Sequence, residues 1–292
     1  MRSRIESMGV SMPGGIISRG SVDHAVAAGK RCIESSKYDR SEIESLINAG
    51  VFRDNHCGEP AMAAFIQEGL GINTSFGMSN TFSFDLNNGG AGMLTVLQTI
   101  DAMMRAGVVR VAMAVTSDAN TDRKPDPNYT YQRSGAAVIM ERSPDSDRGF
   151  GSFVFRTFDE YAGESVSRVE LYKKGGHLTI DKSESLEKEY LACARPVFDE
   201  LLDREEIRRD EIDLVIPSQI SENFLDGLGD SLSIESGKVV NVLKETGGDT
   251  HTSSIIVAMN SAVSRGLATS GTRAVFLAVG SGITVGCALY IF

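Results

Sequence analysis

The chain has 292 residues, of which 41% are hydrophobic and 23% are charged. This length and composition predict a packed globular protein made of one large domain or two fused halves. A net charge of −10 without any basic cluster argues against a nucleic-acid surface. There is no apolar run of membrane-spanning length, no signal-peptide core at the N-terminus, and no CxxC spacing among the four cysteines. We therefore expect a cytoplasmic protein without a disulfide framework or a zinc site.

Hydrophobic periodicity and turn residues predict alternating strands and helices in the first half. The predicted strands are Arg4–Val10, 47–51, 82–84, Val108–Val115 and Ser134–Met140, and the predicted helices are Ser21–Ser36, Ala61–Leu70 and 93–106. Ser21 is the expected N-cap of the first helix, and Gly71 is the expected C-cap of the second. Pro60 suits a first helical turn, which would place Glu59 at that helix N-terminus.

A Gly-rich corner, Asn87-Asn88-Gly89-Gly90-Ala91-Gly92, connects the aromatic strand to the third of these helices. Asn and Gly tolerate positive φ, so the backbone can turn sharply here and approach a ligand closely. A helix that begins at such a corner directs unpaired N–H groups and its positive dipole end toward it. Enzymes expose nucleophiles in this way, but this corner contains neither Cys nor Ser. A tight turn without chemistry is the alternative interpretation.

The second half continues the same alternation. The predicted strands are Phe150–Phe158 (antiparallel), Ile212–Pro217, Lys238–Leu243, 272–279 and 284–292, and the predicted helices are Ser185–Asp203, Ile220–Leu232 and Thr252–Arg265. Residues 160–182 show no clear period, which predicts surface or pocket-covering loops. A second Gly-rich corner, Glu245-Thr246-Gly247-Gly248-Asp249-Thr250-His251, precedes the last helix.

Each half ends in the same order of corner, helix, strand, loop and strand. Strands that alternate with helices imply βαβ units and a largely parallel, buried sheet. The chain is therefore expected to be a duplicated α/β protein with halves at 1–145 and 146–292. The two corners should meet near its centre, each at a helix N-terminus.

Four segments resemble, in order, those of the thiolase-like fold, most closely the ketoacyl-ACP synthase III branch of condensing enzymes. They are FDLNNGGAG (84–92), VIPSQ (215–219), GGDTHTSS (247–254) and the closing GSGITVGCALYIF (280–292). The resemblance implies a five-layered α/β/α/β/α fold, with the first segment as the nucleophile elbow. The segment between Ile17 and Ser21 is much shorter than the N-terminal loop with which the family usually grips coenzyme A.

Every catalytic position implied by the resemblance is altered. The family Cys falls at Gly90 or, by a second alignment, at Ala91; the His position is Ser218 and the Asn position is Asp249. Glycine or alanine cannot carry an acyl group. Three explanations remain open. The chain is an engineered variant whose elbow Cys was replaced, or a naturally inactive partner subunit, or an enzyme that needs no covalent acyl step.

His251 follows Asp249 by two residues and could replace the His missing at Ser218. A helix N-terminus favours the neutral imidazole, which can act as a base. Asp249 is expected either to orient His251 or to take the part of the family Asn, and Ser218 to donate a hydrogen bond. As helix caps alone, both corner residues would look the same in the sequence.

Glu59 belongs to an R-D-x-x-x-x-E-P run that resembles one in relatives that join long acyl chains. There the Glu reaches across a dimer interface as a base. A first-turn Glu that complements the helix dipole is the alternative. Cys57 could be a relocated nucleophile, although a Cys before a helix is more often structural.

Backbone N–H groups at Ala91 and around Ser281 are the expected oxyanion donors, with Gly280, Gly282 and Asn88 beside the substrate. The resemblance implies thioesters of coenzyme A or of an acyl carrier protein as substrates, and no tightly bound cofactor or metal. It also implies a homodimer, formed through the strand after the elbow, or a heterodimer with a Cys-bearing homologue.

Overall fold

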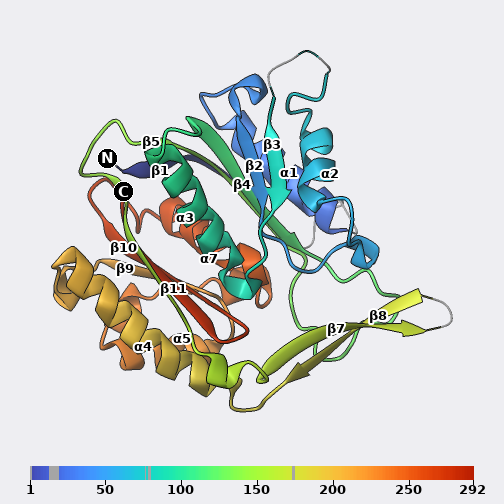
Figure 1. Cartoon of the computed structure of the whole chain (residues 1–292). Helices are drawn as coiled ribbons and strands as arrows, with labels where there is room; N and C mark the ends of the chain where they lie inside the picture. Colours follow the sequence, from blue (N-terminus) through green and yellow to red (C-terminus); the bar gives the residue numbers. More distant parts are fainter. Residues whose placement is uncertain (1, 13–19, 76, 78–79, 173–174) are drawn as a thin grey trace.

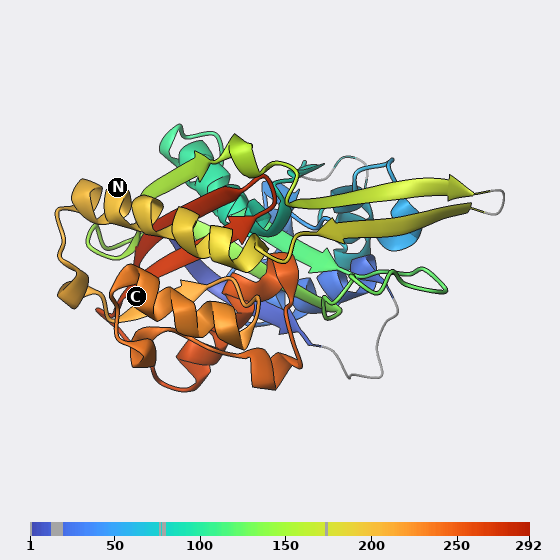
Figure 2. The same ribbon diagram turned by 90° about the horizontal axis from the view of Figure 1, so that it is seen from below.

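The structure is a computed structural model, and it describes residues 2–12, 20–75, 77, 80–172 and 175–292. The predicted α/β class is confirmed: two mixed sheets and their helices form a layered body from which one hairpin projects (Figures 1 and 2). Most of the segment in which we expected a shortened N-terminal loop, between Ile17 and Ser21, lies outside the described residues.

The first sheet has the strand order β1-β5-β4-β2-β3. Its strands are β1 (Ser3–Ser11), β2 (Ser45–Asn48), β3 (Phe82–Asp85), β4 (Val111–Asp118) and β5 (Ser134–Arg142). β5 pairs antiparallel with both β1 and β4, whereas β2 pairs parallel with β4 and β3. The sheet is therefore mixed, and the prediction of a largely parallel sheet is wrong. The link between β4 and β5, residues 119–133, contains no helix, and the two strands pair antiparallel instead of forming a βαβ unit.

The second sheet repeats this arrangement in the order β6-β11-β10-β9. Its strands are β6 (Gly149–Thr157), β9 (Leu214–Pro217), β10 (Arg273–Gly280) and β11 (Thr284–Ile291). β11 pairs antiparallel with β6 and β10, and β9 runs parallel to β10. In place of the strand predicted at Lys238–Leu243 there is a single parallel bridge between Val215 and Val239, followed by the short helix α6 (Leu243–Thr246). That bridge occupies the place of β3 in the first half.

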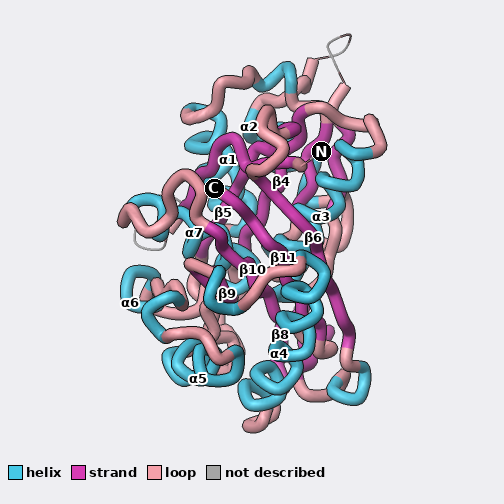
Figure 3. The backbone as a smooth tube through the Cα atoms, turned by 90° about the vertical axis from the view of Figure 1, so that its left-hand side faces the viewer, coloured by secondary structure: helices cyan, strands magenta, loops and turns pink. Residues whose placement is uncertain are grey.

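Helices separate and cover the two sheets, which gives the five layers that were expected (Figures 1 and 3). The central layer, between the sheets, holds α3 (Gly92–Arg105) and α7 (Ser254–Ser264). The outer layer on the first sheet holds α1 (Ser21–Glu34) and α2 (Met62–Leu70). The outer layer on the second sheet holds α4 (Leu186–Glu205) and α5 (Glu222–Leu232). Side chains alternate along β4, so Ala112 and Ala114 face the central helices while Met113 faces α1 and α2. The small alanines let the central helices pack close to the sheet.

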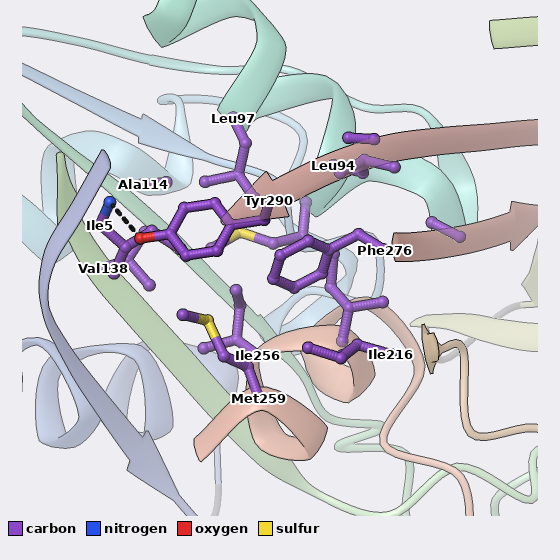
Figure 4. Close-up of a cluster of buried hydrophobic side chains, with 14 of the residues drawn as sticks. Ile5, Leu94, Leu97, Ala114, Val138, Ile216, Ile256, Met259, Phe276 and Tyr290 are labelled. Atoms are coloured by element: carbon purple, nitrogen blue, oxygen red, sulfur yellow. Dashed lines mark hydrogen bonds between the residues drawn. The ribbon is translucent and has the colours of Figure 1, made fainter. Parts of the chain in front are cut away.

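The core between the sheets joins the two ends of the chain (Figure 4). Tyr290 on β11 packs against Phe276 on β10, and its hydroxyl accepts a hydrogen bond from the backbone N–H of Ile5 at 3.2 Å. The hydroxyl would otherwise be buried without a partner, at a cost of about 1–3 kcal/mol. This contact fastens the first strand of one half to the last strand of the other.

Two helix starts differ from the prediction because distant carboxylates cap them. Gly20, rather than Ser21, is the N-cap of α1, and the Asp54 carboxylate accepts hydrogen bonds from the N–H groups of Ser21 and Val22. Helix α2 begins at Met62, two residues after Pro60. Tertiary contacts thus supply the capping that the local sequence was expected to supply.

Residues 160–182, predicted as loops, instead contain a two-stranded hairpin. β7 (Ser165–Tyr172) and β8 (Gly175–Lys182) pair antiparallel and extend from the body of the molecule (Figure 2). At the base of the hairpin, Leu178 and Ile180 are buried against Phe52 and Tyr131. The absence of a single period reflects a two-stranded ribbon of which only this base faces a core.

Candidate active site

The two Gly-rich corners meet at a cavity of about 370 Å³ between the C-terminal ends of the strands. From the sequence-predicted site residues, the cavity is lined by Gly90, Ser218, Asp249, His251, Gly280 and Ser281. The short 3-10 turns that open α3 and α7, Gly89–Ala91 and His251–Ser253, pack against each other beside it. Residues from both halves of the chain are therefore brought together where the sequence predicted.

The first corner is closed tightly against the end of β10. A Cβ atom at Gly90 would lie 2.4 Å from the carbonyl oxygen of Val279, which is closer than any real contact. Gly89 has a φ of +52°, a conformation that favours glycine. The corner backbone thus needs glycine at position 90 and favours it at position 89.

Ala91 does not face the cavity. Its side chain is fully buried in the core between the sheets, and its N–H donates to the carbonyl oxygen of Asn88 at 3.1 Å. The Asn88 side chain donates to the Thr95 hydroxyl at 2.9 Å. The side chain and the N–H of Ala91 are therefore both engaged within the corner, and Ala91 is not among the residues that line the cavity.

The second corner supplies the imidazole of His251 and the carboxylate of Asp249, and β4 brings a second carboxylate, Asp118, beside them. The Nδ1 atom of His251 lies 3.0 Å from Oδ2 of Asp118, which is fully buried at the end of β4. The other oxygen of Asp118 accepts hydrogen bonds from the N–H groups of Val51 and Phe52 at 2.9 and 2.8 Å. Burial alone would raise the pKa of Asp118, but His251, these N–H groups and Thr252 outweigh it and lower that pKa.

The tautomer of His251 follows from this contact. Because Asp118 is held ionised, Nδ1 must be the donor of the hydrogen bond between them. The imidazole therefore keeps Nε2 for a group in the cavity. The ring itself is clamped by Tyr131, whose ring centroid is 4.3 Å away, and by Phe52 at 5.2 Å.

Asp249 orients His251 through the backbone and not through the ring. Its carboxylate accepts a hydrogen bond from the N–H of His251 at 2.7 Å, within a turn where His251 adopts a φ of +49°. Burial in the cavity wall raises the pKa of Asp249 to about 6, although His251 and Lys182 oppose the shift. The expected capping and orienting roles are thus divided between Asp249 and Asp118.

Ser218 and the final turn form the opposite wall. Ser218 is buried, and its hydroxyl oxygen accepts a hydrogen bond from the N–H of Val279 at 3.1 Å. The neighbouring Gln219 donates to the carbonyl oxygens of Pro217 and Val240 and accepts from the N–H of Val242. The VIPSQ segment therefore locks the end of β9 to the chain that leads into the second corner.

The lining residues that were not predicted from the sequence include Lys182 and Tyr190, and the buried Asp118 behind the lining was not predicted either. Lys182, at the end of β8, places its ammonium 4.2 Å from the ring centroid of Tyr131, and burial lowers its pKa. Tyr190 on α4 lies beside Ser281, and burial raises its pKa. No motif marks these positions. For Asp118 the sequence holds one usable signal, which is a carboxylate at the end of an otherwise apolar buried strand.

Glu59 is exposed, is not among the residues that line the cavity, and precedes a cis peptide bond to Pro60. The charge that we expected Glu59 to place at the start of α2 comes from Asp85, whose carboxylate accepts from Met62 and Ala63 at 2.9 Å. Arg53 of the R-D-x-x-x-x-E-P run forms an ion pair with Asp85 at 3.0 Å. In this chain the run therefore organises α1 and α2, and a role for Glu59 as a base across a dimer interface stays a prediction.

The cysteines lie away from the cavity lining. Cys32, Cys193 and Cys287 are buried, and Cys57 is half-buried and donates to the Glu59 carbonyl oxygen. Within the described ranges, no group of three or more His, Cys, Asp or Glu side chains is placed to hold a metal ion. Among the helices of the same residues, none is long and apolar enough to cross a membrane.

Comparisons with known proteins agree with this architecture. Residues 202–292 match the family model described as the C terminal of 3-oxoacyl-[acyl-carrier-protein (ACP)] synthase III. A curated relative, the β-ketoacyl-[acyl-carrier-protein] synthase III of Anaplasma marginale (strain St. Maries), is 27% identical over 278 residues, covering 91% of this chain and 82% of the relative.

Solved structures extend the likeness to the whole fold. The 3-oxoacyl-[acyl-carrier-protein] synthase III of Aquifex aeolicus VF5 superposes with a TM-score of 0.83 at 18% identity, covering 99% of this chain and 100% of that one. The C143S form of Xanthomonas campestris OleA, with bound lauric acid and lauroyl-CoA, gives a TM-score of 0.83 at 16% identity, covering 100% and 99%. The fold and its two central corners define a protein of the thiolase-like class. Within that class, the chain is similar to ketoacyl-ACP synthase III.

Proposed function

We propose that the chain is an acyl-thioester condensing or acyl-transferring enzyme of lipid or natural-product biosynthesis, with thioesters of coenzyme A or of an acyl carrier protein as substrates. The observation that carries the proposal is the Asp118–His251 pair on the cavity where both corners meet. A buried carboxylate that fixes the tautomer of an imidazole is an arrangement suited to general base catalysis. The names of the relatives supply the substrate class.

The test uses the intact chain and octanoyl-coenzyme A. We expect release of free coenzyme A, followed with a thiol-reactive chromophore, to exceed the rate without protein. The variant His251→Asn should abolish that excess, because Asn tolerates the positive φ of this position but cannot accept a proton. A chain that neither binds nor consumes octanoyl-coenzyme A or octanoyl-acyl carrier protein would contradict the proposal.

A catalytically silent subunit is the second candidate, and the absence of any cysteine from the cavity lining favours it. Such a subunit should co-purify with a Cys-bearing homologue as a heterodimer. Size-exclusion chromatography with light scattering separates this outcome from a homodimer or a monomer.

The strand after the first corner has no free edge for pairing with a second subunit. That strand, β4, is paired on both sides, with β5 and β2. The edge strands of the first sheet are β1 and β3, and β3 lies before the corner and carries Phe82 with 65% of its surface exposed. We therefore propose that any dimer forms through β3, because an exposed strand edge with an apolar side chain invites pairing.

A further inference from the structure

The cavity holds a complete base but lacks a thiol to carry an acyl group. His251 presents Nε2, Asp118 holds Nδ1 at 3.0 Å, and Tyr131 fixes the ring plane. This is the arrangement of a general base that is oriented by a buried carboxylate. In a mechanism with a covalent acyl-enzyme, the imidazole would be expected to contact the nucleophile. In the described part of the chain, the hydrogen bonds of His251 join it to Asp118 and Asp249 and to no lining hydroxyl.

The corner that would carry a nucleophile cannot hold one in its present backbone conformation. Any Cβ at Gly90 meets the Val279 carbonyl oxygen at 2.4 Å, and that oxygen belongs to the backbone of β10. Ser218, the buried hydroxyl on the facing wall, is held by the N–H of Val279. The space in front of Nε2 is therefore left for a second substrate.

We propose that His251 acts as general base in a single-step acyl transfer from a thioester to an amine or hydroxyl acceptor, without an acyl-enzyme. Nε2 removes the proton of the acceptor N–H or O–H while the lone pair of the acceptor nitrogen or oxygen forms the bond to the acyl carbon. The C–S bond of the thioester breaks, and the thiolate leaves with the electron pair. The thiolate regains a proton from the imidazolium, so the enzyme returns to its starting state. Asp118 is the positioning residue for His251.

The charges around the cavity define the acceptor class. Its lining includes the carboxyl groups of Glu184, Glu187 and Asp249 against one ammonium group, Lys182. This excess of carboxylates disfavours an acceptor with its own carboxylate, such as a malonyl thioester, because like charges in a partly desolvated site repel. An amine or an uncharged alcohol does not meet this penalty.

The inference rests on the proposed function, and bisubstrate kinetics separate the two. The full-length chain is given octanoyl-coenzyme A with ethanolamine, which offers both an amine and a hydroxyl, or with malonyl-coenzyme A. We expect octanoyl transfer to ethanolamine, intersecting double-reciprocal lines, and no octanoyl adduct by intact mass. Parallel lines with an adduct, or exclusive use of malonyl-coenzyme A, would overturn the inference and leave the proposed function standing. Failure to consume any thioester would overturn both.

Two variants test the roles of the pair. His251→Gly should lower the transfer rate about 100-fold or more, and its backbone should survive, because a φ of +49° suits glycine. Added imidazole should restore part of the rate, which a merely structural defect would not allow. Asp118→Asn should move the acid limb of the rate–pH profile to lower pH, because the carboxylate that favours the imidazolium is gone. An unchanged profile together with no imidazole rescue would refute the assigned roles.

Discussion

Gly90 and His251 illustrate how two single residues set the chemistry of the cavity. Gly90 brings the first corner within contact of the Val279 carbonyl oxygen, and His251 occupies a left-handed conformation that non-glycine residues rarely adopt. A strained histidine persists only where surrounding contacts over-determine it. Here these contacts are the Asp118 hydrogen bond, the Asp249 turn and the Tyr131 ring.

Replacing Gly90 with alanine should destabilise the protein. The added Cβ must displace the β10 backbone or the corner, which costs about 1–3 kcal/mol, the usual range for overpacking. Urea unfolding followed by circular dichroism measures this cost. Gly58→Ala is the matched control, because a Cβ at Gly58 meets nothing within 4 Å, and its effect should stay within about 0.5 kcal/mol. Equal stability of the two variants would show that the corner is looser than its geometry indicates.

How far the sequence predicts the site depends on the range of the interaction. His251 and Asp249 could be found because a Gly-rich turn before a helix is a local pattern. Asp118 could not be assigned, because its partner lies 133 positions away in the sequence and only the packing of β4 against the second corner joins them. The capping of α2 could not be predicted for the same reason, since the carboxylate at the start of that helix is Asp85, from a later strand, and not Glu59.

Among the elements, the β7–β8 hairpin has the clearest link to the site. Its base packs on Phe52 and Tyr131, which are the two rings that clamp His251, and its last residue, Lys182, lines the cavity. Asp122 ties the hairpin to the body by accepting from the Leu178 N–H at 2.9 Å and from His56. The geometry of the base thus depends on an element that projects from the body and has little core of its own.

Leu178→Ala should loosen the hairpin and slow the reaction. Removal of this buried side chain costs about 2 kcal/mol or more, and the loss should appear as faster hydrogen exchange in β7 and β8 before any global unfolding. Val169→Ala on the partner strand is the control, since that side chain is 47% exposed. If the two variants exchanged alike and released coenzyme A at the same rate, the hairpin would not support the site.

The elements themselves were largely predictable. Strands such as β4 and β10 are continuous apolar runs that local pattern identifies, and helix ends such as Gly71 follow backbone chemistry. The hairpin and the bridge at Val239 were not predictable. Whether such a segment forms a strand depends on the segment with which it pairs, and periodicity within the segment does not reveal that partner.

At the scale of the whole molecule, the net charge of −10 opposes the substrates proposed for it. Coenzyme A thioesters carry phosphate groups, so donor and protein repel each other over long range. Salt screens this repulsion, with a Debye length of about 10 Å at 0.1 M ionic strength. Association should therefore improve as salt is added, opposite to the usual behaviour of a steered encounter.

The KM for octanoyl-coenzyme A should fall roughly two-fold or more between about 20 and 300 mM sodium chloride. Octanoyl-N-acetylcysteamine is uncharged and has the same acyl group, so its KM should stay constant over this range. A KM for octanoyl-coenzyme A that rises with salt would instead reveal a local basic surface that attracts the donor.

The internal repeat places a glycine pair opposite the Asp118–His251 pair. β4 and β10 each span eight residues, so Asp118, the last residue of β4, corresponds to Gly280. The turns before α3 and α7 likewise match His251 with Gly89, whose φ values of +49° and +52° nearly coincide. Each half keeps one of the two functional side chains, Asp118 in the first half and His251 in the second, and has glycine at the other place. A chain with either half doubled would bring two carboxylates or two imidazoles to its centre, so the Asp–His pair exists only because the two halves differ.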